Sequence, residues 1–148
     1  MGDVNVVDDV ETKVTGIEVS GDDSYIEFPV QAADPFLALQ LKNLDRFLKI
    51  VLRVVDSANK HRTFVMSNRR TTVHLQDNVV QLPMELGLGW QYMNIDLRDI
   101  TTKCFGTEFV VITNIMIYGS TRIGKIYFQE KPYSDLELPH FMRLLPSL

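Results

Sequence analysis

A chain of 148 residues with 45% apolar and 23% charged side chains is long enough for one domain with a substantial hydrophobic core. Its apolar runs are shorter than the ~20 residues that span a bilayer, and its start lacks the basic and apolar segments of a signal peptide. We therefore expect a soluble intracellular protein with no membrane role. The single cysteine, Cys104, excludes a disulfide within the chain.

The net charge of −4 is unevenly distributed along the chain. Residues 1–34 contain nine acidic residues and one basic residue, whereas residues 35–148 contain fourteen basic and ten acidic residues. Charge asymmetry of this kind concerns binding partners and not the fold. It indicates either a solvated acidic start, with residues 1–13 as an acidic, flexible N-terminal segment, or two oppositely charged faces that meet two partners.

Alternation of apolar and polar residues at a period of two predicts half-buried strands over residues 25–30, 37–42, 48–54 and 93–97. The run 109–118 is apolar at successive positions, which is typical of a central strand. Turn-forming residues separate the strands, at 21–23, 56–59, 67–70, 77–78, 87–89 and 119–120. Such closely spaced strands favour antiparallel pairing over parallel units joined by helices.

One short helix is predicted near residues 96–105. Apolar and small residues recur there at helical spacing and form one stripe, comprising Leu97, Ile100, Thr101, Cys104 and Phe105. Asp96 or Asp99 is suited to the N-terminus of this helix, and Gly106 to a left-handed C-terminal stop. Cys104 is therefore expected to face the core as a small hydrophobic residue.

These elements together predict a single all-β domain over residues 1–148. We expect an antiparallel two-sheet β-sandwich, jelly-roll-like, with one short α-helix near residues 96–105. The inward phase of the strands and helix gives the predicted core, which comprises Ile26, Phe28, Leu39, Leu41, Ile50, Leu52, Val54, Phe64, Leu82, Met93, Ile95, Leu97, Ile100, Ile115, Ile117 and Phe128.

The sequence shows no catalytic, metal-binding or cofactor-binding signature. The histidines His61, His74 and His140 are isolated from other metal-ligating residues, and the chain has no phosphate-binding glycine motif. We therefore expect no enzyme activity, no cofactor, no small-molecule substrate and no nucleic-acid partner.

Three aromatic residues at outward strand positions, Trp90, Tyr92 and Tyr118, leave an alternative function open. Such residues form stacking platforms in carbohydrate- and ligand-binding jelly-roll modules. The other interpretation is that Trp90 is a packing residue that closes one end of the sandwich.

Short landmarks between the strands point to a family. In chain order they are Lys42-Asn43-Leu44, Asn59, Arg62, Phe64, Ser67-Asn68, Leu82-Pro83-Met84, Gly89-Trp90, Phe105-Gly106-Thr107, Arg122-Ile123, Tyr127-Phe128, Tyr133-Ser134 and Glu137-Leu138-Pro139. In order and spacing this set resembles the cilia- and flagella-associated protein 20 family, from about Pro35 to the C-terminus and more weakly back to Val14.

The resemblance implies a non-enzymatic structural protein of ciliary and flagellar doublet microtubules. Members of that family lie at the inner junction, where the B-tubule closes onto the A-tubule, and bind tubulin and neighbouring inner-junction or microtubule inner proteins. The implied location is the cytoskeleton of the cytoplasm, in the axoneme of cilia or flagella or in the basal body or centriole. Because its basic content is lower and the family's N-terminal segment is not matched, we expect the chain to be a divergent member or paralogue.

The basic residues that remain define a predicted partner interface, which comprises Lys60, Arg62, Arg69, Arg70, Lys103, Arg122 and Lys125. The first four are assigned to two neighbouring turns, and the last three match the family's basic surface. We expect some of these side chains to face the acidic surface of tubulin, while residues 8–34 face a more basic neighbour.

Overall fold

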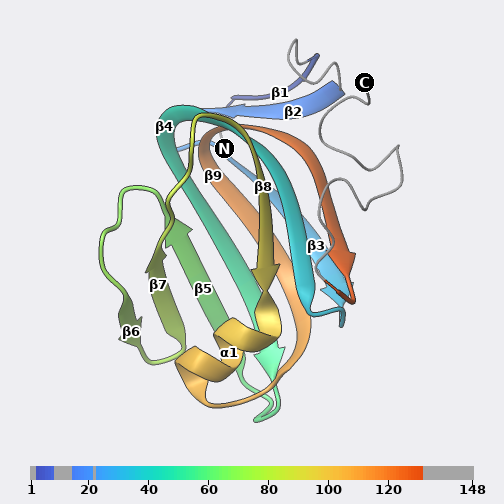
Figure 1. Cartoon of the computed structure of the whole chain (residues 1–148), viewed down its shortest axis with the longest axis vertical. Helices are drawn as coiled ribbons and strands as arrows, with labels where there is room; N and C mark the ends of the chain where they lie inside the picture. Colours follow the sequence, from blue (N-terminus) through green and yellow to red (C-terminus); the bar gives the residue numbers. More distant parts are fainter. Residues whose placement is uncertain (1–2, 9–14, 22, 132–148) are drawn as a thin grey trace.

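The computed structural model describes residues 3–8, 15–21 and 23–131 (Figure 1). These residues form strands joined in one hydrogen-bonded sheet and one α-helix. The elements are β1 (Asp3–Asp8), β2 (Thr15–Ser20), β3 (Tyr25–Ala32), β4 (Phe36–Asp56), β5 (His61–Ser67), β6 (His74–Gln76), β7 (Val79–Pro83), β8 (Gly89–Asp96), α1 (Leu97–Phe105) and β9 (Phe109–Gln129). Residues Asp3–Asp8 of the predicted flexible segment thus form β1, which pairs with β2.

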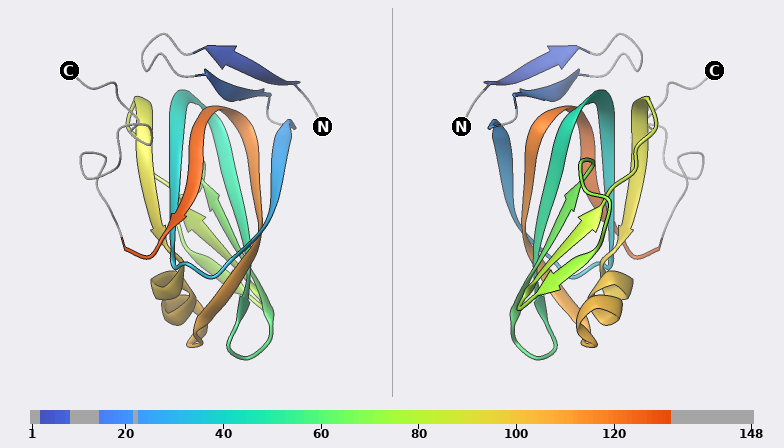
Figure 2. Two further views of the ribbon diagram at one scale, coloured as in Figure 1. Left: turned by 90° about the vertical axis from the view of Figure 1, so that its right-hand side faces the viewer. Right: turned by 90° about the vertical axis from the view of Figure 1, so that its left-hand side faces the viewer.

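Two long strands, β4 and β9, form the centre of the sheet, and β2, β3, β5 and β8 pair with them. They pair antiparallel along most of their length, and both bend sharply midway, β4 between Asn43 and Leu48 and β9 at Gly119. The bend folds the sheet over on itself, as the arches in Figure 2 show. One limb, the β5 limb, contains β3, β5, β6 and β7 with Leu48–Asp56 of β4, and the other, the β8 limb, contains β8 and β2 with Phe36–Asn43.

Gly119 is required at the bend. Its φ of 99° lies in the left-handed region, and a Cβ added there would sit 2.1 Å from the Phe47 carbonyl oxygen. Any side chain would therefore strain the backbone and separate the two bent strands. The predicted turn at residues 119–120 is wrong for this reason, because the strand continues through the bend as β9.

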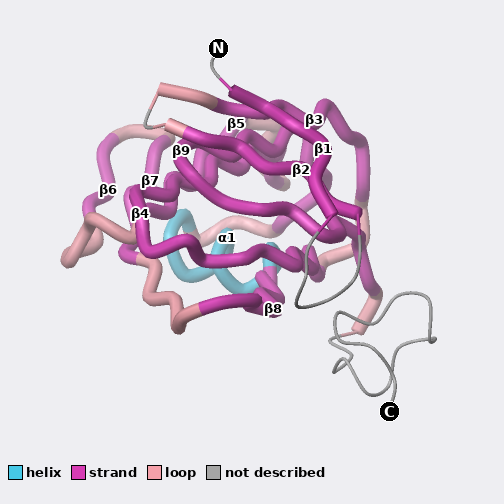
Figure 3. The backbone as a smooth tube through the Cα atoms, turned by 90° about the horizontal axis from the view of Figure 1, so that it is seen from above, coloured by secondary structure: helices cyan, strands magenta, loops and turns pink. Residues whose placement is uncertain are grey.

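The core consists of the inward residues of both limbs, which form one hydrophobic cluster. Most predicted core residues belong to this cluster, which Leu37, Leu48 and Ile112 extend. The other predicted core residues are partly buried and pack against it, namely Ile26, Phe28, Leu82, Met93, Ile100 and Phe128. The helix α1 lies at the end of the molecule opposite the bend, where Figure 3 shows it between β8 and the β5 limb. Phe105 of α1 packs edge-on against Phe64 of β5, with ring centroids 5.7 Å apart.

The predicted helix is confirmed. The Asp99 N–H donates to the Asp96 carboxylate at 3.0 Å at the start of α1, and Gly106 adopts a left-handed φ of 68° at its end. Both features satisfy backbone groups that a helix terminus leaves without partners.

The mostly β fold is also confirmed, but two finer points differ from the prediction. The described strands form one continuous sheet, and β5 pairs with β7 in parallel. The parallel pair arises because the chain leaves β5, forms β6 at the outer edge and returns as β7 in the direction of β5. The predicted strands 37–42 and 48–54 are two halves of β4.

Candidate partner-binding surfaces

A buried charged cluster lies at the helix end of the molecule, around Asp56 at the end of β4. The Arg62 Nε donates to one carboxylate oxygen of Asp56 at 2.7 Å, and the Thr107 hydroxyl donates to the same oxygen at 2.7 Å. The other oxygen accepts the N–H groups of Ala58 and Lys60 at 3.1 and 3.0 Å. One carboxylate therefore fixes the β4–β5 turn and ties it to the chain after α1.

Arg62 is held inside the fold by further contacts. One guanidinium nitrogen donates to the Asn78 side chain at 2.6 Å, and the guanidinium carbon lies 4.3 Å from the centre of the Phe105 ring. Only 8% of Arg62 is exposed. The prediction of an outward position for Arg62 is wrong, because the buried Asp56 carboxylate draws the side chain to the inner face of β5.

The electrostatics of this cluster favour a structural role for Asp56 over a catalytic one. Burial raises the pKa of Asp56, but hydrogen bonds from Arg62, the Lys60 N–H and Thr107, together with the charge of Arg62, outweigh it and place the pKa well below its ordinary value. A carboxylate that is ionised at neutral pH, and whose two oxygens both accept hydrogen bonds, is unsuited to act as a general acid. The cluster holds the β4–β5 turn against the chain that follows α1.

Two of the predicted interface cations remain exposed at the helix end, namely Lys60 in the β4–β5 turn and Lys103 in α1. The Lys103 ammonium lies 3.0 Å from the Asp99 carboxylate one helical turn away, and this contact raises the pKa of Lys103. The charge of Lys103 is therefore partly offset within the helix.

The opposite, bend end carries a second group of cations. Arg69 and Arg70 follow β5, and the guanidinium of Arg69 lies 4.7 Å from the centre of the Phe47 ring in the bend. The structure adds Arg46, which is exposed in the bend itself. We call Arg46, Arg69 and Arg70 the bend-end cations. Sequence reasoning missed Arg46 because it lies in an irregular part of a strand that was expected to end before it.

Two asparagines near these cations stabilise the bend through hydrogen bonds to the backbone. The Asn68 side chain accepts the Leu48 N–H at 3.0 Å and donates to the Arg46 carbonyl at 2.7 Å, so it bridges the irregular part of β4. The Asn43 side chain accepts the Asp45 N–H at 2.9 Å and donates to the Gly87 carbonyl at 2.7 Å.

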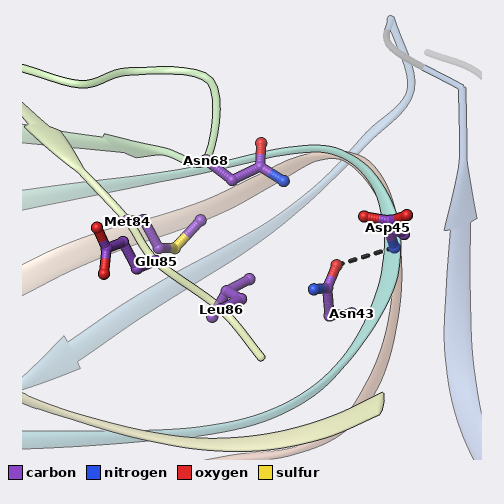
Figure 4. Close-up of a pocket in the computed structure, with 6 residues that line it drawn as sticks. All are labelled: Asn43, Asp45, Asn68, Met84, Glu85 and Leu86. Atoms are coloured by element: carbon purple, nitrogen blue, oxygen red, sulfur yellow. Dashed lines mark hydrogen bonds between the residues drawn. The ribbon is translucent and has the colours of Figure 1, made fainter. Parts of the chain in front are cut away.

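An open cleft lies between these asparagines (Figure 4). It has a volume of about 410 Å³ and is lined by Asn43, Asp45, Asn68, Met84, Glu85 and Leu86. In the figure, the side-chain amides of Asn43 and Asn68 lie on opposite sides of the cleft, and the carboxylate of Asp45 lies at the bend. Because both amides hold backbone groups, the cleft is mainly a product of the bend and its supports.

The last two predicted cations, Arg122 and Lys125, lie on the β9 segment of the β8 limb. Arg122 forms an ion pair with Glu18 of β2 at 2.8 Å, and both side chains are about three-quarters buried. Trp90 packs on Gly124 between them, since a Cβ at Gly124 would lie 3.0 Å from the indole ring. Trp90 therefore acts as a packing residue.

The predicted basic residues thus do not form one patch. Lys60 and Arg69 lie beyond opposite ends of β5, a seven-residue strand, and each strand residue advances the chain by about 3.3 Å. The assignment of the first four residues to two neighbouring turns is wrong, because β5 separates these turns by its full length. Two exposed groups remain, one at the helix end and one at the bend end.

Other residues that could carry chemistry in the part of the chain that the structure describes are the metal-ligating types, among them Cys104. Within residues 3–8, 15–21 and 23–131, no group of His, Cys, Asp and Glu is arranged to hold a metal ion. Cys104 packs against the core as predicted, and burial raises the pKa of its thiol. No helix among the described residues is long and apolar enough to cross a membrane. His140 lies outside the described residues.

Several landmark residues now have a structural role. Asn43 and Asn68 support the bend, Arg62 and Thr107 hold Asp56, and Gly106 ends α1. These five landmark residues therefore maintain the bend, the Asp56 cluster and the end of α1, and relatives of the same fold would need the same contacts.

Comparison with known proteins agrees with this interpretation. A family model for the CFA20 domain matches residues 1–146. The chain is 29% identical over 155 residues to Cilia- and flagella-associated protein 20 of Chlamydomonas reinhardtii, an alignment that covers 98% of this chain and 82% of the relative. The protein of the same name in Paramecium tetraurelia is 29% identical over 155 residues, with 98% and 81% covered. That of Caenorhabditis elegans is 25% identical over 152 residues, with 97% and 75% covered. The chain belongs to the CFA20 domain family.

Proposed function

We propose that this chain is a non-enzymatic structural protein of ciliary and flagellar doublet microtubules, placed at the inner junction between the B-tubule and the A-tubule. The observation that carries the proposal is the family match over residues 1–146, with relatives named as cilia- and flagella-associated proteins. Association with cilia and flagella follows from these names, and the place within the doublet is what the resemblance of the landmarks implies.

The use of polar residues in the fold supports a structural role. Asp56, Arg62 and Thr107 saturate one another, and Asn43 and Asn68 hold backbone groups. These polar side chains, four of which belong to the landmark set, are thus engaged in holding the fold. We further propose that the folded sheet is a variant of the family's jelly-roll-like sandwich, with its two limbs in place of two separate sheets.

The proposed partners are tubulin and neighbouring inner-junction or microtubule inner proteins. The bend-end cations are suited to the acidic surface of tubulin, because Arg46 and Arg69 are exposed at one end of the molecule. A single exposed ion pair contributes only about 0–1 kcal/mol, so binding requires the sum of several contacts repeated along a filament.

A carbohydrate-binding role is less well supported by the geometry. The three outward aromatics do not share a platform, since Trp90 and Tyr92 lie on the β8 limb and Tyr118 on the β5 limb. Tyr118 is moreover covered by Tyr25, with ring centroids 5.1 Å apart, and by the Lys49 ammonium at 4.4 Å.

The decisive experiment is localisation in a ciliated cell. We expect the tagged chain to remain with the axoneme after detergent extraction and to be released by high salt, because screening shortens electrostatic range from about 10 Å at 0.1 M salt to about 3 Å at 1 M. Recovery of the protein in the detergent-soluble fraction would contradict the proposal. Binding of the purified chain to a glycan array but not to microtubules would favour the carbohydrate-binding role.

A further inference from the structure

The outer face of the β5 limb, on the side away from the core, carries an apolar row between two cations. Lys49, Val51 and Arg53 of β4 belong to this face. The residues between them, Ile50 and Leu52, are completely buried in the core, and side chains alternate along a strand. The helix α1 lies on the inner side of the limb, toward β8 (Figure 3). We propose that this outer face is a docking surface for an acidic protein surface with an apolar centre. The inference rests on the proposed function, under which that partner is tubulin.

The apolar row crosses three adjacent strands at the centre of this face. Met116 of β9 pairs with Val51 of β4, and Val51 pairs with Val65 of β5. Residues that are paired across neighbouring strands lie side by side on one face of a sheet. Val51 is 8% exposed, and Met116 and Val65 are partly exposed. A partner placed on the row would remove the remaining apolar surface from water, which favours binding.

Two cations flank the row along β4. Lys49 and Arg53 lie two residues to either side of Val51, which separates their backbone positions by about 13 Å at about 3.3 Å per residue. The Lys49 ammonium lies 4.4 Å from the centre of the Tyr118 ring, and Arg53 is exposed. Within residues 3–8, 15–21 and 23–131, neither cation forms an ion pair with a carboxylate. Both charges are therefore available to carboxylates of a partner.

The charge of this face favours an acidic partner. Among the described strands of the limb, the one carboxylate on the outer face is that of Glu27 on β3, and the Asn114 side chain donates a hydrogen bond to it. The face is thus positive on a chain whose net charge is −4. It also continues into the bend-end cations, because Ser67, which pairs with Lys49, lies two residues before Arg69. A positive surface of this kind is complementary to an acidic one.

The size and composition of the face fit a protein partner. From β3 to β6 the limb spans five strand spacings, or about 24 Å, and Lys49–Val55 extends about 20 Å along β4. The resulting area of roughly 480 Å² is smaller than the roughly 800 Å² that each partner buries in a stable interface, so the bend-end cations must add to the contact. An apolar centre with a charged rim is typical of protein–protein interfaces, whereas nucleic-acid phosphates are bound mainly by basic and polar groups.

The test is co-sedimentation of the purified full chain with microtubules assembled from tubulin. We expect Lys49→Glu with Arg53→Glu to weaken binding about tenfold or more, because both positions would then repel an acidic surface. Met116→Gln is neutral and similar in length, and it should also weaken binding because it makes the apolar centre polar. The matched control is Lys60→Glu with Arg98→Glu, which reverses two exposed cations at the helix end and should weaken binding less.

Lysine labelling locates the contact on the chain. An amine-acylating reagent should modify Lys49 more slowly in the microtubule-bound chain than in the free chain. Lys60, at the helix end, should be modified at the same rate in both. Mass spectrometry of the digested chain measures both lysines in one sample. If circular dichroism shows that the charge-reversed pair does not fold, Lys49→Gln with Arg53→Gln replaces it and should also weaken binding.

The outcomes separate this inference from the proposed function. Suppose that the wild-type chain binds microtubules and stays with the axoneme. The docking surface is then wrong if the Lys49 and Arg53 variant binds like its control, if Met116→Gln binds like the wild type, or if Lys49 keeps its full reactivity. Retention with the axoneme without binding to purified microtubules would indicate a partner other than tubulin and would also overturn the inference. Recovery of the wild-type chain in the detergent-soluble fraction of ciliated cells would overturn the proposed function, and the inference with it.

Discussion

The two ends of the folded sheet differ in whether their charged residues are buried or exposed. At the helix end, Asp56 and Arg62 are turned inward and satisfied by each other and by neighbouring donors and acceptors. At the bend end, Arg46 and Arg69 are turned outward, and the backbone is held by the uncharged side chains of Asn43 and Asn68.

This difference has a physical basis. A buried ion pair stabilises a fold only when every charged atom finds a partner, and an unmatched member is very costly. A neutral amide can bridge irregular backbone without needing a partner of opposite charge. The cations beside Asn43 and Asn68 are therefore not needed to hold the backbone and can face other molecules. The same set of family landmarks thus contains residues that build the fold and residues that lie next to a surface suited to partners.

The largest expected effect comes from removing one member of the buried pair. Arg62→Met keeps much of the side-chain volume but leaves the Asp56 carboxylate buried without its cation. We expect a loss of about 3–5 kcal/mol in the free energy of unfolding, measured by urea denaturation. The double variant Asp56→Asn with Arg62→Met should be less destabilised than Arg62→Met alone, because Asn is neutral and still accepts hydrogen bonds. Equal losses would show that packing of Arg62 on Phe105 matters more than charge.

The pH dependence of stability tests the same end of the molecule. The pKa of Asp56 is lowered in the folded state, so its stabilising contribution is complete above the unfolded-state pKa of about 3.9 and is lost as pH falls below that value. We expect the urea midpoint of the wild-type chain to fall steeply below about pH 4. The midpoint of Asp56→Asn should change less over the same range. Parallel curves for the two proteins would contradict the role assigned to Asp56.

A smaller effect is expected from Asn68→Ala at the bend. This change removes the acceptor of the Leu48 N–H and the donor to the Arg46 carbonyl, which should cost about 1–2 kcal/mol of unfolding free energy. Asn43→Ala is the matched control. Its hydrogen bonds are exposed, so water can replace them, and its loss should be smaller. A loss from Asn43→Ala as large as that from Asn68→Ala would show that the loop at Gly87 is as important as the bend.

Periodicity in the sequence predicted strand segments within β3, β4, β8 and β9, the helix and the core, because burial on one face leaves a repeating apolar pattern. It did not predict that residues 37–42 and 48–54 form one strand. The intervening Asn43-Leu44-Asp45-Arg46-Phe47 breaks the alternation and contains turn-forming residues, and the contact that keeps the strand continuous comes from Asn68, twenty residues after Leu48. Local patterns do not show a support of that kind.

The candidate surfaces were predictable only in part. The sequence identified which cations the chain keeps, but it could not separate Arg62 from the others, because the partner that buries it, Asp56, was assigned to a turn. Nor could it show that Trp90 and Tyr118 lie on different limbs, since their strands pair with different halves of β4. Both outcomes depend on strand register, which is set by the whole fold.

Charge reversal at each end should have the smallest effect on stability. It also tests most directly whether the two ends differ in binding a partner. Arg46→Glu with Arg69→Glu changes the two exposed cations of the bend end, and Lys60→Glu with Lys103→Glu changes the helix end by the same number of charges. Each pair should change the unfolding free energy by less than about 1 kcal/mol, because exposed charges and cation–π contacts contribute little. We expect the bend-end pair to reduce co-sedimentation with microtubules at moderate salt. The helix-end pair should have a smaller effect, because Lys103 is already paired with Asp99. Equal losses would assign binding to net charge alone, and unchanged binding by the bend-end pair would make that end a solvated face.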